Sequence, residues 1–484
     1  MNPIRLLVYV LTLWPAAACL SAATNAPRPN IVFILSDDQG WGDAGYRGSG
    51  IKTPSLDRLA AEGVRLETFY TQPLCSPTRA ALLTGRYPIR YGLQVGVVRP
   101  HARYGIPAEE RTLAEALREA GYRTAMVGKW HLGHIRSEFL PTSQGFEHHY
   151  GLYTGNFDYF THRRDGGLDW HRNGQVVEEH GYATDLIADE AARLIAGHDG
   201  RRPLFLYVAF NAPHTPLQVP EKYSALYADW PEPRRLYAGM ITAMDEGIGR
   251  ILAALEQRGM RSNTLIVFSS DNGGSRPGVM ADNGPFRDAK GSYYEGGVRV
   301  PALAVWDGKL AAGAAVTAPL HMVDWFPMLL RLAGASPDQP LPLDGHDAWP
   351  ALTDGAPSPH DELLINVGVA GGAIRVGDWK LIVNGHVRDG LEGGEEIEER
   401  KELKRRARAE PKIELFDLRS DPSERNNLAE AEPEVAARLR ARLARYEDAA
   451  VPSKQAPPRP GFKPPPVWGP QGGTKGREWA RAGK

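Results

Sequence analysis

Two pairs of residues have the side chains needed to hold a metal ion. Asp37 and Asp38 follow one apolar run, and Asp271 and Asn272 follow another run much later in the chain. All four offer oxygen ligands, which suit a hard cation such as Ca²⁺ or Mg²⁺ better than Zn²⁺. Adjacent aspartates are common turn residues, so the metal interpretation depends on the second acid–amide pair. We therefore expect a divalent-cation site if the fold brings the two pairs together.

Cys75 opens the segment Cys75-Ser-Pro-Thr-Arg79. Ser76 is typical of a helix N-cap, Pro77 of a first helical position and Gly85 of a helix end. These residues predict a short helix with Cys75 just before its N-terminus, where backbone N–H groups favour an anion. As a thiolate Cys75 could be a nucleophile, although soft sulfur beside an all-oxygen site is a chemical mismatch. The alternative is a buried structural cysteine.

Lysines and histidines occur at similar places. Lys129 and His131 follow one apolar run, His214 follows another, and Lys290 lies in a glycine-rich loop. Taken singly, such a lysine is usually solvated and such a histidine is usually a packed or surface residue. The shared position of three of them at the ends of apolar runs predicts one site that combines acids, lysines and histidines.

Short apolar strands that alternate with amphipathic helices must position these residues. This pattern runs from residue 30 to about 344 and is typical of βαβ units around a parallel sheet. The predicted strands are 31–35, 124–127, 204–210, 265–268 and 301–306, and the predicted helices include 112–120 and 241–255. In open parallel sheets ligands bind beyond the carboxyl ends of the strands. We therefore expect the segments that follow the first four strands to meet in one crevice.

The chain becomes more polar after Asp344. Strands at 363–366, 373–376, 379–383 and 414–418 and a helix at 432–446 predict a smaller antiparallel sheet closed by a helix. The charged run 395–410 is interpreted as a solvated helix or mobile insertion rather than a binding patch. The predicted division is a catalytic domain at 29–345, a C-terminal subdomain at 346–450, and a Pro/Gly-rich tail at 451–484, wrapped on the surface or disordered.

The composition excludes several classes of protein. The 484 residues carry 57 Lys and Arg against 58 Asp and Glu, a net charge of −1. There is no basic excess of the kind that drives nucleic-acid binding. The two cysteines cannot build a disulfide framework, and 42% hydrophobic with 24% charged residues is typical of a globular protein.

The first residues predict export. Arg5, the apolar run 6–14 and the small residues around Cys19 resemble a signal peptide, which we place at 1–24. The run is too short to span a bilayer, which disfavours a membrane anchor, and no later stretch is suited to crossing one. A lipid anchor on Cys19 is the alternative. We expect a periplasmic or extracellular protein, in which Cys75 would be an isolated thiol in an oxidising compartment.

Two segments resemble sulfatase signatures. Residues 75–79, followed by Leu-Leu-Thr-Gly-Arg at 82–86, resemble the C-x-P-x-R motif in which the cysteine is oxidised to formylglycine, and 128–133 resemble the second signature. With both acid pairs in order, residues 29 to about 427 resemble the type I, formylglycine-dependent sulfatases. The resemblance implies an α/β, alkaline-phosphatase-like fold. Its large mixed, mostly parallel sheet lies between helices, beside a smaller C-terminal antiparallel-sheet subdomain.

Within this family, segments 70–75, 91–94, 214–220 and 467–470 resemble arylsulfatase B, the N-acetylgalactosamine 4-sulfatase. Unlike the animal enzymes, the chain has two cysteines and no Asn-x-Ser/Thr sequon, which favours a bacterial, exported member. The implied substrate is 4-sulfated N-acetylgalactosamine of chondroitin or dermatan sulfate, attacked in an exo manner. Another sulfated polysaccharide or an aryl sulfate is the alternative. A phosphoester or phosphonate hydrolase and a carbohydrate-binding pseudo-sulfatase are weaker ones.

The resemblance also implies residue roles. Cys75, converted by a formylglycine-generating enzyme to the formylglycine hydrate, would be the nucleophile. His214 would protonate the departing sugar oxygen, and His131 would take a proton from the second hydroxyl of the hydrate. Ca²⁺ would bind the hydrate and a sulfate oxygen. The remaining implied contacts are Ca²⁺ with Asp37, Asp38, Asp271 and Asn272, the formylglycine oxygens with Arg79 and Lys129, and the sulfate with Lys129 and Lys290.

Two loops are expected to form the walls of the pocket, at 97–105 and 151–172. The second contains Tyr153, Tyr159, His162 and Trp170, which suit sugar contacts and core packing equally well. A sugar alkoxide is a poor leaving group, so a positioned general acid is expected to contribute about 10²–10⁴-fold to the rate.

Overall fold

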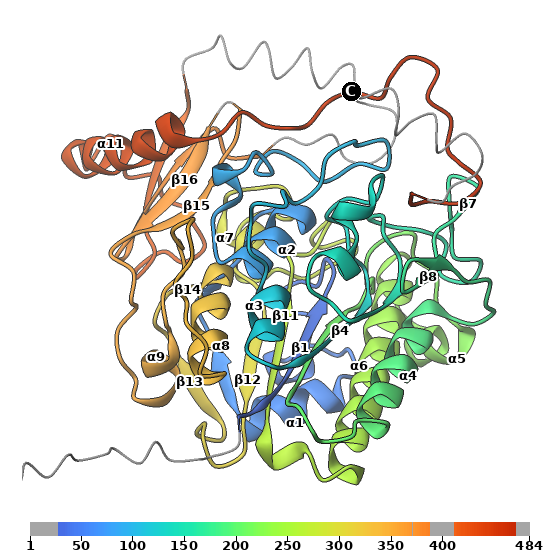
Figure 1. Cartoon of the computed structure of the whole chain (residues 1–484). Coiled ribbons are helices and arrows are strands. Elements are labelled where there is room, and N and C mark those ends of the chain that lie inside the picture. The colour runs from blue at the N-terminus through green and yellow to red at the C-terminus, as the bar shows by residue number, and fades with distance from the viewer. Residues whose placement is uncertain (1–27, 370, 388–410, 471–484) are drawn as a thin grey trace, which may run out of the picture.

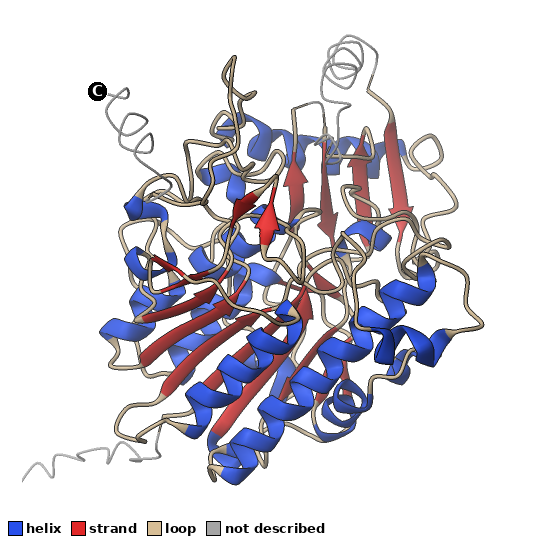
Figure 2. Cartoon of the chain, turned by 90° about the vertical axis from the view of Figure 1, so that its right-hand side faces the viewer, coloured by secondary structure: helices blue, strands red, loops and turns tan. Residues whose placement is uncertain are grey.

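A ten-stranded sheet runs through the computed structural model, which describes residues 28–369, 371–387 and 411–470 (Figure 2). The strand order is β13-β2-β12-β11-β1-β10-β4-β5-β8-β9. The bounds are β1 Asn30–Ser36, β2 Val64–Leu66, β4 Arg123–Gly128, β5 His148–Gly151, β8 His171–Arg172, β9 Gln175–Val176, β10 Leu204–Ala209, β11 Thr264–Ser270, β12 Ala302–Val305 and β13 Ala314–Val316.

The centre of the sheet is parallel. β11, β1, β10, β4 and β5 pair in parallel, and the strands predicted there are confirmed. The predicted strand at 301–306 is also present as β12, but it runs antiparallel to β11. A parallel connection needs a crossover that spans the sheet. Between β11 and β12 the only described α-helix is the four-residue α7, Glu295–Val298, and the chain returns along the same edge.

Helices cover both faces of the sheet (Figures 1 and 2). Side chains alternate along β1, so that Ile31, Phe33 and Leu35 face one core and Val32 and Ile34 face the other. The first core includes α2, α3 and α8, and the second includes α1, α4 and α6. Bounds are α1 Pro54–Glu62, α2 Cys75–Thr84, α3 Leu113–Glu119, α4 Ala183–Ala196, α5 Glu221–Ser224, α6 Arg234–Gln257, α8 Trp325–Leu332 and α9 Trp349–Thr353.

Local sequence explains where helix α3 starts and stops. The Thr112 side chain accepts a hydrogen bond from the Glu115 backbone, and the Glu115 carboxylate accepts one from the Thr112 backbone. This reciprocal capping box satisfies N–H groups that a helix start leaves without partners. Gly121 follows the end of the helix at a φ of 86°. The helix predicted at 112–120 is confirmed.

A four-stranded antiparallel sheet follows the large one in the chain. It consists of β15 Leu363–Val367, β16 Gly372–Val376, β17 Trp379–Val383 and β18 Ile413–Asp417. Helix α11, Pro433–Ala449, packs Leu439 and Leu443 against this sheet. The small pairs β3 Phe69–Tyr70 with β14 Leu320–His321, and β6 Arg163–Arg164 with β7 Gly167–Leu168, complete the strands. The smaller antiparallel sheet and its helix are confirmed.

Residues 451–470 lie against the large domain rather than apart from it (Figure 1). Of the two outcomes predicted for the tail, wrapping on the surface holds for this stretch. The predicted signal peptide at 1–24 with Cys19, the charged run 395–410 and the end of the tail lie outside the described residues. Within the described ranges, no helix is both long and apolar enough to cross a membrane. The domain boundaries near 345 and 450 stay predictions.

Candidate active site

The segments that follow four neighbouring strands meet at one edge of the sheet, as expected. Asp37 follows β1, Lys129 follows β4, His214 lies beyond β10 and Asp271 follows β11. Their strands pair in the order β11-β1-β10-β4, so their carboxyl ends lie side by side. Gly128 permits the close packing here, because a Cβ at this position would lie 1.9 Å from the Ala209 carbonyl oxygen.

Asp37 is at the centre of the cluster. Its Oδ1 lies 3.4 Å from the Cys75 sulfur, and its Oδ2 accepts a hydrogen bond from Lys129 Nζ. Arg79 lies 3.4 Å from the same Oδ2. Burial by itself would raise the pKa of Asp37, but Lys129, His214 and Arg79 hold it below its ordinary value. The carboxylate is therefore ionised although it has no contact with solvent.

Asp38 faces a second lysine and the amide of Asn272. Lys290 Nζ lies 2.8 Å from Asp38 Oδ1, and Asn272 Nδ2 donates to the same oxygen at 2.7 Å. Ser275 Oγ donates to Oδ2 at 3.2 Å. Asp38 has a φ of 66°, a left-handed conformation that aspartate tolerates better than most residues. This loop conformation thus allows two consecutive carboxylates to belong to the same site.

Arg79 connects three parts of the site. Its Nε and a terminal nitrogen donate to Asp271 Oδ2 at 3.1 and 2.8 Å, and another nitrogen donates to the Lys129 carbonyl at 2.9 Å. Both the guanidinium and the Asp271 carboxylate are fully buried. Because Arg79 lies one turn after Cys75 on α2, these bonds fix the cysteine relative to the acids.

The start of helix α2 differs from the prediction. The helix begins at Cys75 itself, its N-cap is Leu74, and Ser76 makes no cap hydrogen bond. The Ser76 hydroxyl instead donates to the His131 carbonyl at 2.8 Å and accepts from the Val98 amide at 2.9 Å. Tertiary partners have replaced the local cap. Gly85 ends the helix at a φ of 66°, as predicted.

The Cys75 thiol is 1% exposed. Burial and the nearby carboxylates of Asp271 and Asp37 raise its pKa well above the ordinary value. Reactive cysteines have lowered pKa values, because the thiolate is the nucleophile. An unmodified Cys75 is consequently protonated at neutral pH and poorly suited to attack.

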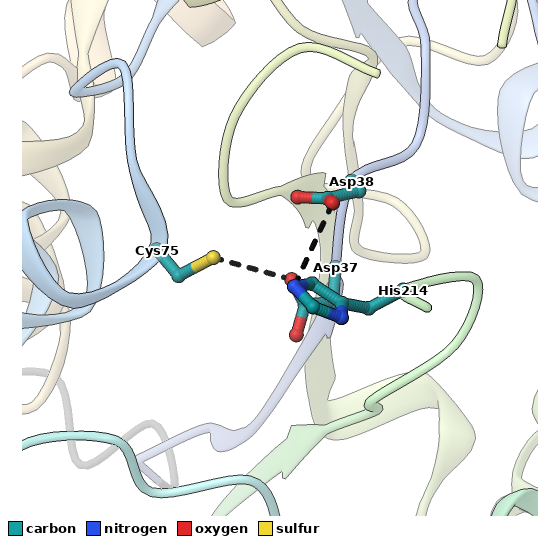
Figure 3. Close-up of side chains that lie close together, drawn as sticks. All are labelled: Asp37, Asp38, Cys75 and His214. Carbon is teal, nitrogen blue, oxygen red and sulfur yellow. Dashed lines mark hydrogen bonds and ion pairs between the residues drawn. The ribbon is translucent and has the colours of Figure 1, made fainter. Parts of the chain in front are cut away.

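His214 approaches the acids from the other side of Asp37 (Figure 3). Its Nδ1 lies 2.7 Å from the Thr215 carbonyl, which assigns the proton to Nδ1 and directs Nε2 towards Asp38 Oδ2 at 3.8 Å. Tyr159 holds this loop, since its hydroxyl lies 2.8 Å from the His214 carbonyl. Burial and Lys290 lower the pKa of His214, with Asp38 and Asp37 opposing them.

His131 lies beside this cluster and has an unusual environment. Its φ is 60°, which is uncommon for a residue other than glycine. A Cβ at Gly155 would lie 2.6 Å from the imidazole, so the ring packs directly on that glycine. Its Nδ1 is buried and has no hydrogen-bond partner among the described residues. Burial, Lys129 and Arg79 hold the pKa of His131 well below its usual range.

The residues present fit a hard divalent cation. Ligand atoms of Asp37, Asp38, Cys75 and His214 lie within 4.8 Å of one another. Asp271 Oδ1 adjoins them through the Asp38 amide at 3.2 Å. Asn272 Oδ1 is buried without a hydrogen-bond partner among the described residues. Such an oxygen is suited to bind a cation, since buried polar atoms normally have a partner. Carboxylate and amide oxygens are ligands that Ca²⁺ prefers, whereas the cysteine sulfur fits only after conversion to oxygen ligands.

All ten residues selected from the sequence therefore lie at or next to one buried site. The aromatic residues of the second wall loop, Tyr153, Tyr159, His162 and Trp170, are at most 1% exposed and pack in the core. Tyr159 supports the site from behind, through its bond to the His214 carbonyl, and does not offer a surface for a sugar. Sequence reasoning missed Ser275 and Gly155 and assigned Ser76 to a helix cap, although all three position the site. Only Ser275 had a sequence signal, since it follows the Asp271-Asn272-Gly-Gly segment directly.

Comparisons with known proteins agree with this geometry. The sulfatase family model matches residues 29–335. Mouse arylsulfatase J is 36% identical over 93% of this chain and 81% of its own length, and mouse N-acetylgalactosamine-6-sulfatase is 38% identical over 69% and 68%. The crystal structure of Ps i-CgsB in complex with k-i-k-neocarrahexaose superposes with a TM-score of 0.77 at 30% identity, over 89% of this chain and 95% of that one.

The match covers the strands that carry the acids, the helix that begins at Cys75 and the strand-end loops with Lys129 and His214. The structural likeness extends the agreement to the smaller sheet and confirms the alkaline-phosphatase-like fold. The narrower likeness to arylsulfatase B stays a prediction. The chain belongs to the sulfatase family and is a sulfuric ester hydrolase.

Proposed function

We propose that the protein is an exported, calcium-dependent sulfatase that uses a formylglycine made from Cys75. Its leading substrate is the 4-sulfate of N-acetylgalactosamine in chondroitin or dermatan sulfate, removed in an exo manner. The carrying observation is that Cys75 lies at the start of a helix, 3.4 Å from the buried Asp37 carboxylate, in a cluster with Asp38 and His214. Two lysines donate hydrogen bonds to the carboxylates of this cluster. This arrangement suits transfer of an anionic group.

The two groups added to the chain supply defined chemistry. A formylglycine hydrate at Cys75 would supply a hydroxyl nucleophile and a second hydroxyl for release. Ca²⁺ held by Asp37, Asp38, Asp271 and Asn272 would supply electrostatic stabilisation of sulfate oxygens. A formylglycine-generating enzyme is the partner required for maturation.

The protein's own side chains would bind the sulfate and orient the nucleophile. Lys129, which is fully buried, and Lys290, whose side chain is 12% exposed, would bind sulfate oxygens and stabilise the charge that moves towards the leaving oxygen. Arg79 holds Asp271 and the Lys129 backbone, which orients the first turn of α2. Since water is largely excluded, these interactions act in a low-dielectric environment.

His214 is the proposed general acid. With its Nδ1 bonded to the Thr215 carbonyl, its Nε2 points into the site and can carry the proton for the sugar oxygen. His131 is the proposed base for the second hydroxyl, because burial and Lys129 favour its neutral form. Both roles depend on geometry that the strand-end loops impose.

Support for a sugar substrate comes from the relatives. The mouse relative at 38% identity is named for N-acetylgalactosamine 6-sulfate, and Ps i-CgsB was solved with an oligosaccharide. The burial of Cys75 and Asp37 supports attack on a terminal group that can enter a deep site. Paired 4-sulfated and 6-sulfated galactosamine disaccharides test the position, and carrageenan fragments and aryl sulfates test the alternative classes.

A leaving-group series on His214→Asn tests the mechanism. The variant should lose about 10²–10⁴-fold in kcat for a sugar sulfate, because the alkoxide then leaves unprotonated. It should lose far less for 4-nitrophenyl sulfate, whose phenolate leaves readily. An equal loss on both substrates would contradict a general acid. Faster turnover of phosphate esters than of sulfate esters by the parent protein would contradict the proposed substrate class.

A further inference from the structure

Packing, rather than a hydrogen bond at Nδ1, orients the ring of His131. Its Nδ1 is buried and has no hydrogen-bond partner among the described residues. Its backbone has a φ of 60°, a left-handed conformation that is uncommon for a residue other than glycine. A reacting group that is misplaced by about 1 Å can lose about 10²-fold in rate. The residues that pack against this ring therefore matter for any reaction in which His131 takes part.

One short segment, residues 153–155, contacts both the backbone and the ring of His131. The His131 amide donates to the Tyr153 carbonyl at 3.1 Å. A Cβ at Gly155 would lie 2.6 Å from the imidazole, so the ring rests directly on the glycine backbone. A shift of this segment would consequently move the ring.

Asp169 holds this segment with three hydrogen bonds. Its Oδ1 accepts from the Tyr153 amide at 3.0 Å, and its Oδ2 accepts from the Thr154 amide at 2.9 Å and from the Thr154 hydroxyl at 2.6 Å. Asp169 is fully buried. Burial raises the pKa of Asp169, but hydrogen bonds from His171, Thr154 and Tyr153 lower it to about 2. The carboxylate is therefore ionised, and hydrogen bonds to an ionised acceptor are stronger than neutral ones.

The fourth partner of this carboxylate also packs on the segment. His171 Nε2 lies 3.1 Å from Asp169 Oδ1. The His171 ring stacks on Tyr153, with ring centroids 4.0 Å apart and 17° between the ring planes. Since His171 belongs to β8, both contacts connect the segment to the large sheet.

The backbone that carries Asp169 is itself well anchored. The Asp169 amide donates to the His162 carbonyl at 2.9 Å. In the preceding strand β7, the Leu168 amide donates to the Pro466 carbonyl, and the Trp468 amide donates to the Leu168 carbonyl, both at 2.9 Å. Figure 1 shows the C-terminal stretch beside β7. Asp169 can therefore fix the position of another segment.

We propose that Asp169 is a positioning residue for His131, which it keeps in place by holding residues 153–155 against the imidazole. The inference rests on the proposed function, in which His131 takes a proton from the second hydroxyl. The electron pair of that O–H bond then forms the aldehyde double bond, and the sulfate leaves with the electrons of its C–O bond. Asp169 thus affects release of sulfate, whereas His214 serves departure of the sugar oxygen.

Asp169→Asn tests this assignment with almost no change in volume. One oxygen becomes an NH₂ group that faces other donors, so we expect the segment and the ring to shift and kcat for 4-nitrophenyl sulfate to fall about 10²-fold. Nitrophenolate should still depart quickly, because that step does not use His131. About one equivalent per active site should therefore appear in a burst before slow turnover. Slow turnover without a burst would overturn the proposal.

Asp245→Asn is the matched control. Asp245 is 1% exposed, and its carboxylate accepts hydrogen bonds from the amides of Ser55 and Leu56 at 2.9 and 2.8 Å, at the start of α1. The control variant also replaces a buried carboxylate that holds backbone amides. It should keep the time course of the parent protein per folded molecule. A burst of the same size in the control would show that the effect of Asp169→Asn is a general consequence of lost stability.

A double variant tests whether Asp169 acts through His131. Added to His131→Ala, Asp169→Asn should cost less than about threefold in kcat, because the ring that it positions is already absent. Losses that multiply in the double variant would overturn the proposal, since Asp169 would then act independently of His131.

A spectroscopic measurement separates this inference from the proposed function. In Cys75→Ala protein with isotopically labelled histidine, the ring resonance of His131 is the one that His131→Ala removes. It should shift in Asp169→Asn and keep its position in Asp245→Asn. If no sulfate ester is cleaved but this pattern is seen, the proposed function fails and the positioning of His131 stands. A resonance that does not move in Asp169→Asn overturns the inference whatever the activity.

Discussion

Two regions of this protein bury several charged side chains, yet they are arranged differently. In the active site, Asp37, Asp38 and Asp271 face Arg79 and two lysines, and the side-chain oxygen Oδ1 of Asn272 has no hydrogen-bond partner among the described residues. In the second region, Lys380 lies 2.8 Å from Glu295 and 2.9 Å from Glu424, and all three are buried. We call these three residues the interface triad.

The charged groups of the interface triad interact with one another and with a neighbouring tyrosine. The Glu295 carboxylate accepts hydrogen bonds from Tyr70 at 2.9 and 3.0 Å, and its amide donates to Glu424 at 2.6 Å. Lys380 comes from β17 of the small sheet, whereas Tyr70 and Glu295 belong to β3 and α7. The triad therefore holds the small sheet against the rest of the chain. Removing one member of a buried set of paired charges leaves the others without a partner and destabilises the interface, whereas a buried set with an unpaired ligand atom can bind a ligand.

Replacing the cysteine gives the largest expected effect and separates the two regions. Cys75→Ala should lower sulfate release by at least about 10⁴-fold, because the nucleophile is lost. The melting temperature should hardly change, since the small side chain leaves a minor cavity. Activity assays and calorimetry on the same preparation check both statements, together with a mass measurement of the Cys75 peptide. Sulfate release close to that of the parent protein would refute the assigned nucleophile.

Lys380→Met should show the reverse behaviour. It leaves two buried carboxylates without their shared cation, so we expect the free energy of unfolding to fall by about 3–5 kcal/mol. Activity per folded molecule should be retained. Denaturant unfolding measures the loss, and Lys222→Met, at a lysine whose side chain is 61% exposed, is the control. A loss no larger than that of the control would show that the triad does not stabilise the interface.

Calcium should stabilise the folded protein by binding in the active site and not at the interface triad. Free Ca²⁺ at a hundred times its dissociation constant should add about 2.7 kcal/mol to the free energy of unfolding, because it binds the folded state alone. Asn272→Ala and Asp38→Asn should lose most of this gain, whereas Glu424→Gln should keep it. Thermal unfolding in EGTA and in excess calcium provides the readout independently of activity. Stabilisation that survives both substitutions would place the ion elsewhere.

The smallest expected effect is a pH dependence of the triad. Burial raises the pKa of Glu424 to about 7, against Lys380, which lowers it. Between the ordinary value of 4.5 and this value the folded state binds more protons than the unfolded chain, so the free energy of unfolding falls as pH rises. Burial raises the pKa of Glu295, but Lys380 and two arginines lower it to about 2, so this group affects stability only at more acidic pH.

Glu424→Gln should remove this contribution. Relative to the parent protein, the variant should gain up to about 1.4 kcal/mol per pH unit between pH 5 and 7. Denaturant titrations of both proteins across this range measure the difference. A constant difference at all pH values would mean that Glu424 does not titrate in this window.

Much of the active site could be predicted because local sequence patterns indicate where its residues lie. Alternation of apolar strands and helices located the strand ends, and polar residues directly after those ends marked Asp37, Lys129 and Asp271. The left-handed end of α2 at Gly85 was equally local. Ser76 was misinterpreted as a cap, since its partners, Val98 and His131, are far away in the sequence.

The interface triad had no such signal. Lys380 and Glu295 are far apart in the chain, and no periodicity links them. Likewise, nothing in the tail indicates that Val467 forms a bridge to Leu168 of β7. Two residues with ordinary local contexts become functionally or structurally paired only through the packing of distant elements.

The sequence by itself determined the strands and helices, the set of chemical groups and the edge of the sheet at which they meet. Backbone periodicity and hydrophobic burial are properties of neighbouring residues, so they can be read without a structure. Only the tertiary structure decided that Asn272 Oδ1 has no hydrogen-bond partner within the described ranges, that His214 directs Nε2 towards Asp38 and that residues 451–470 pack against the large domain. These features depend on distances between segments that no local pattern encodes.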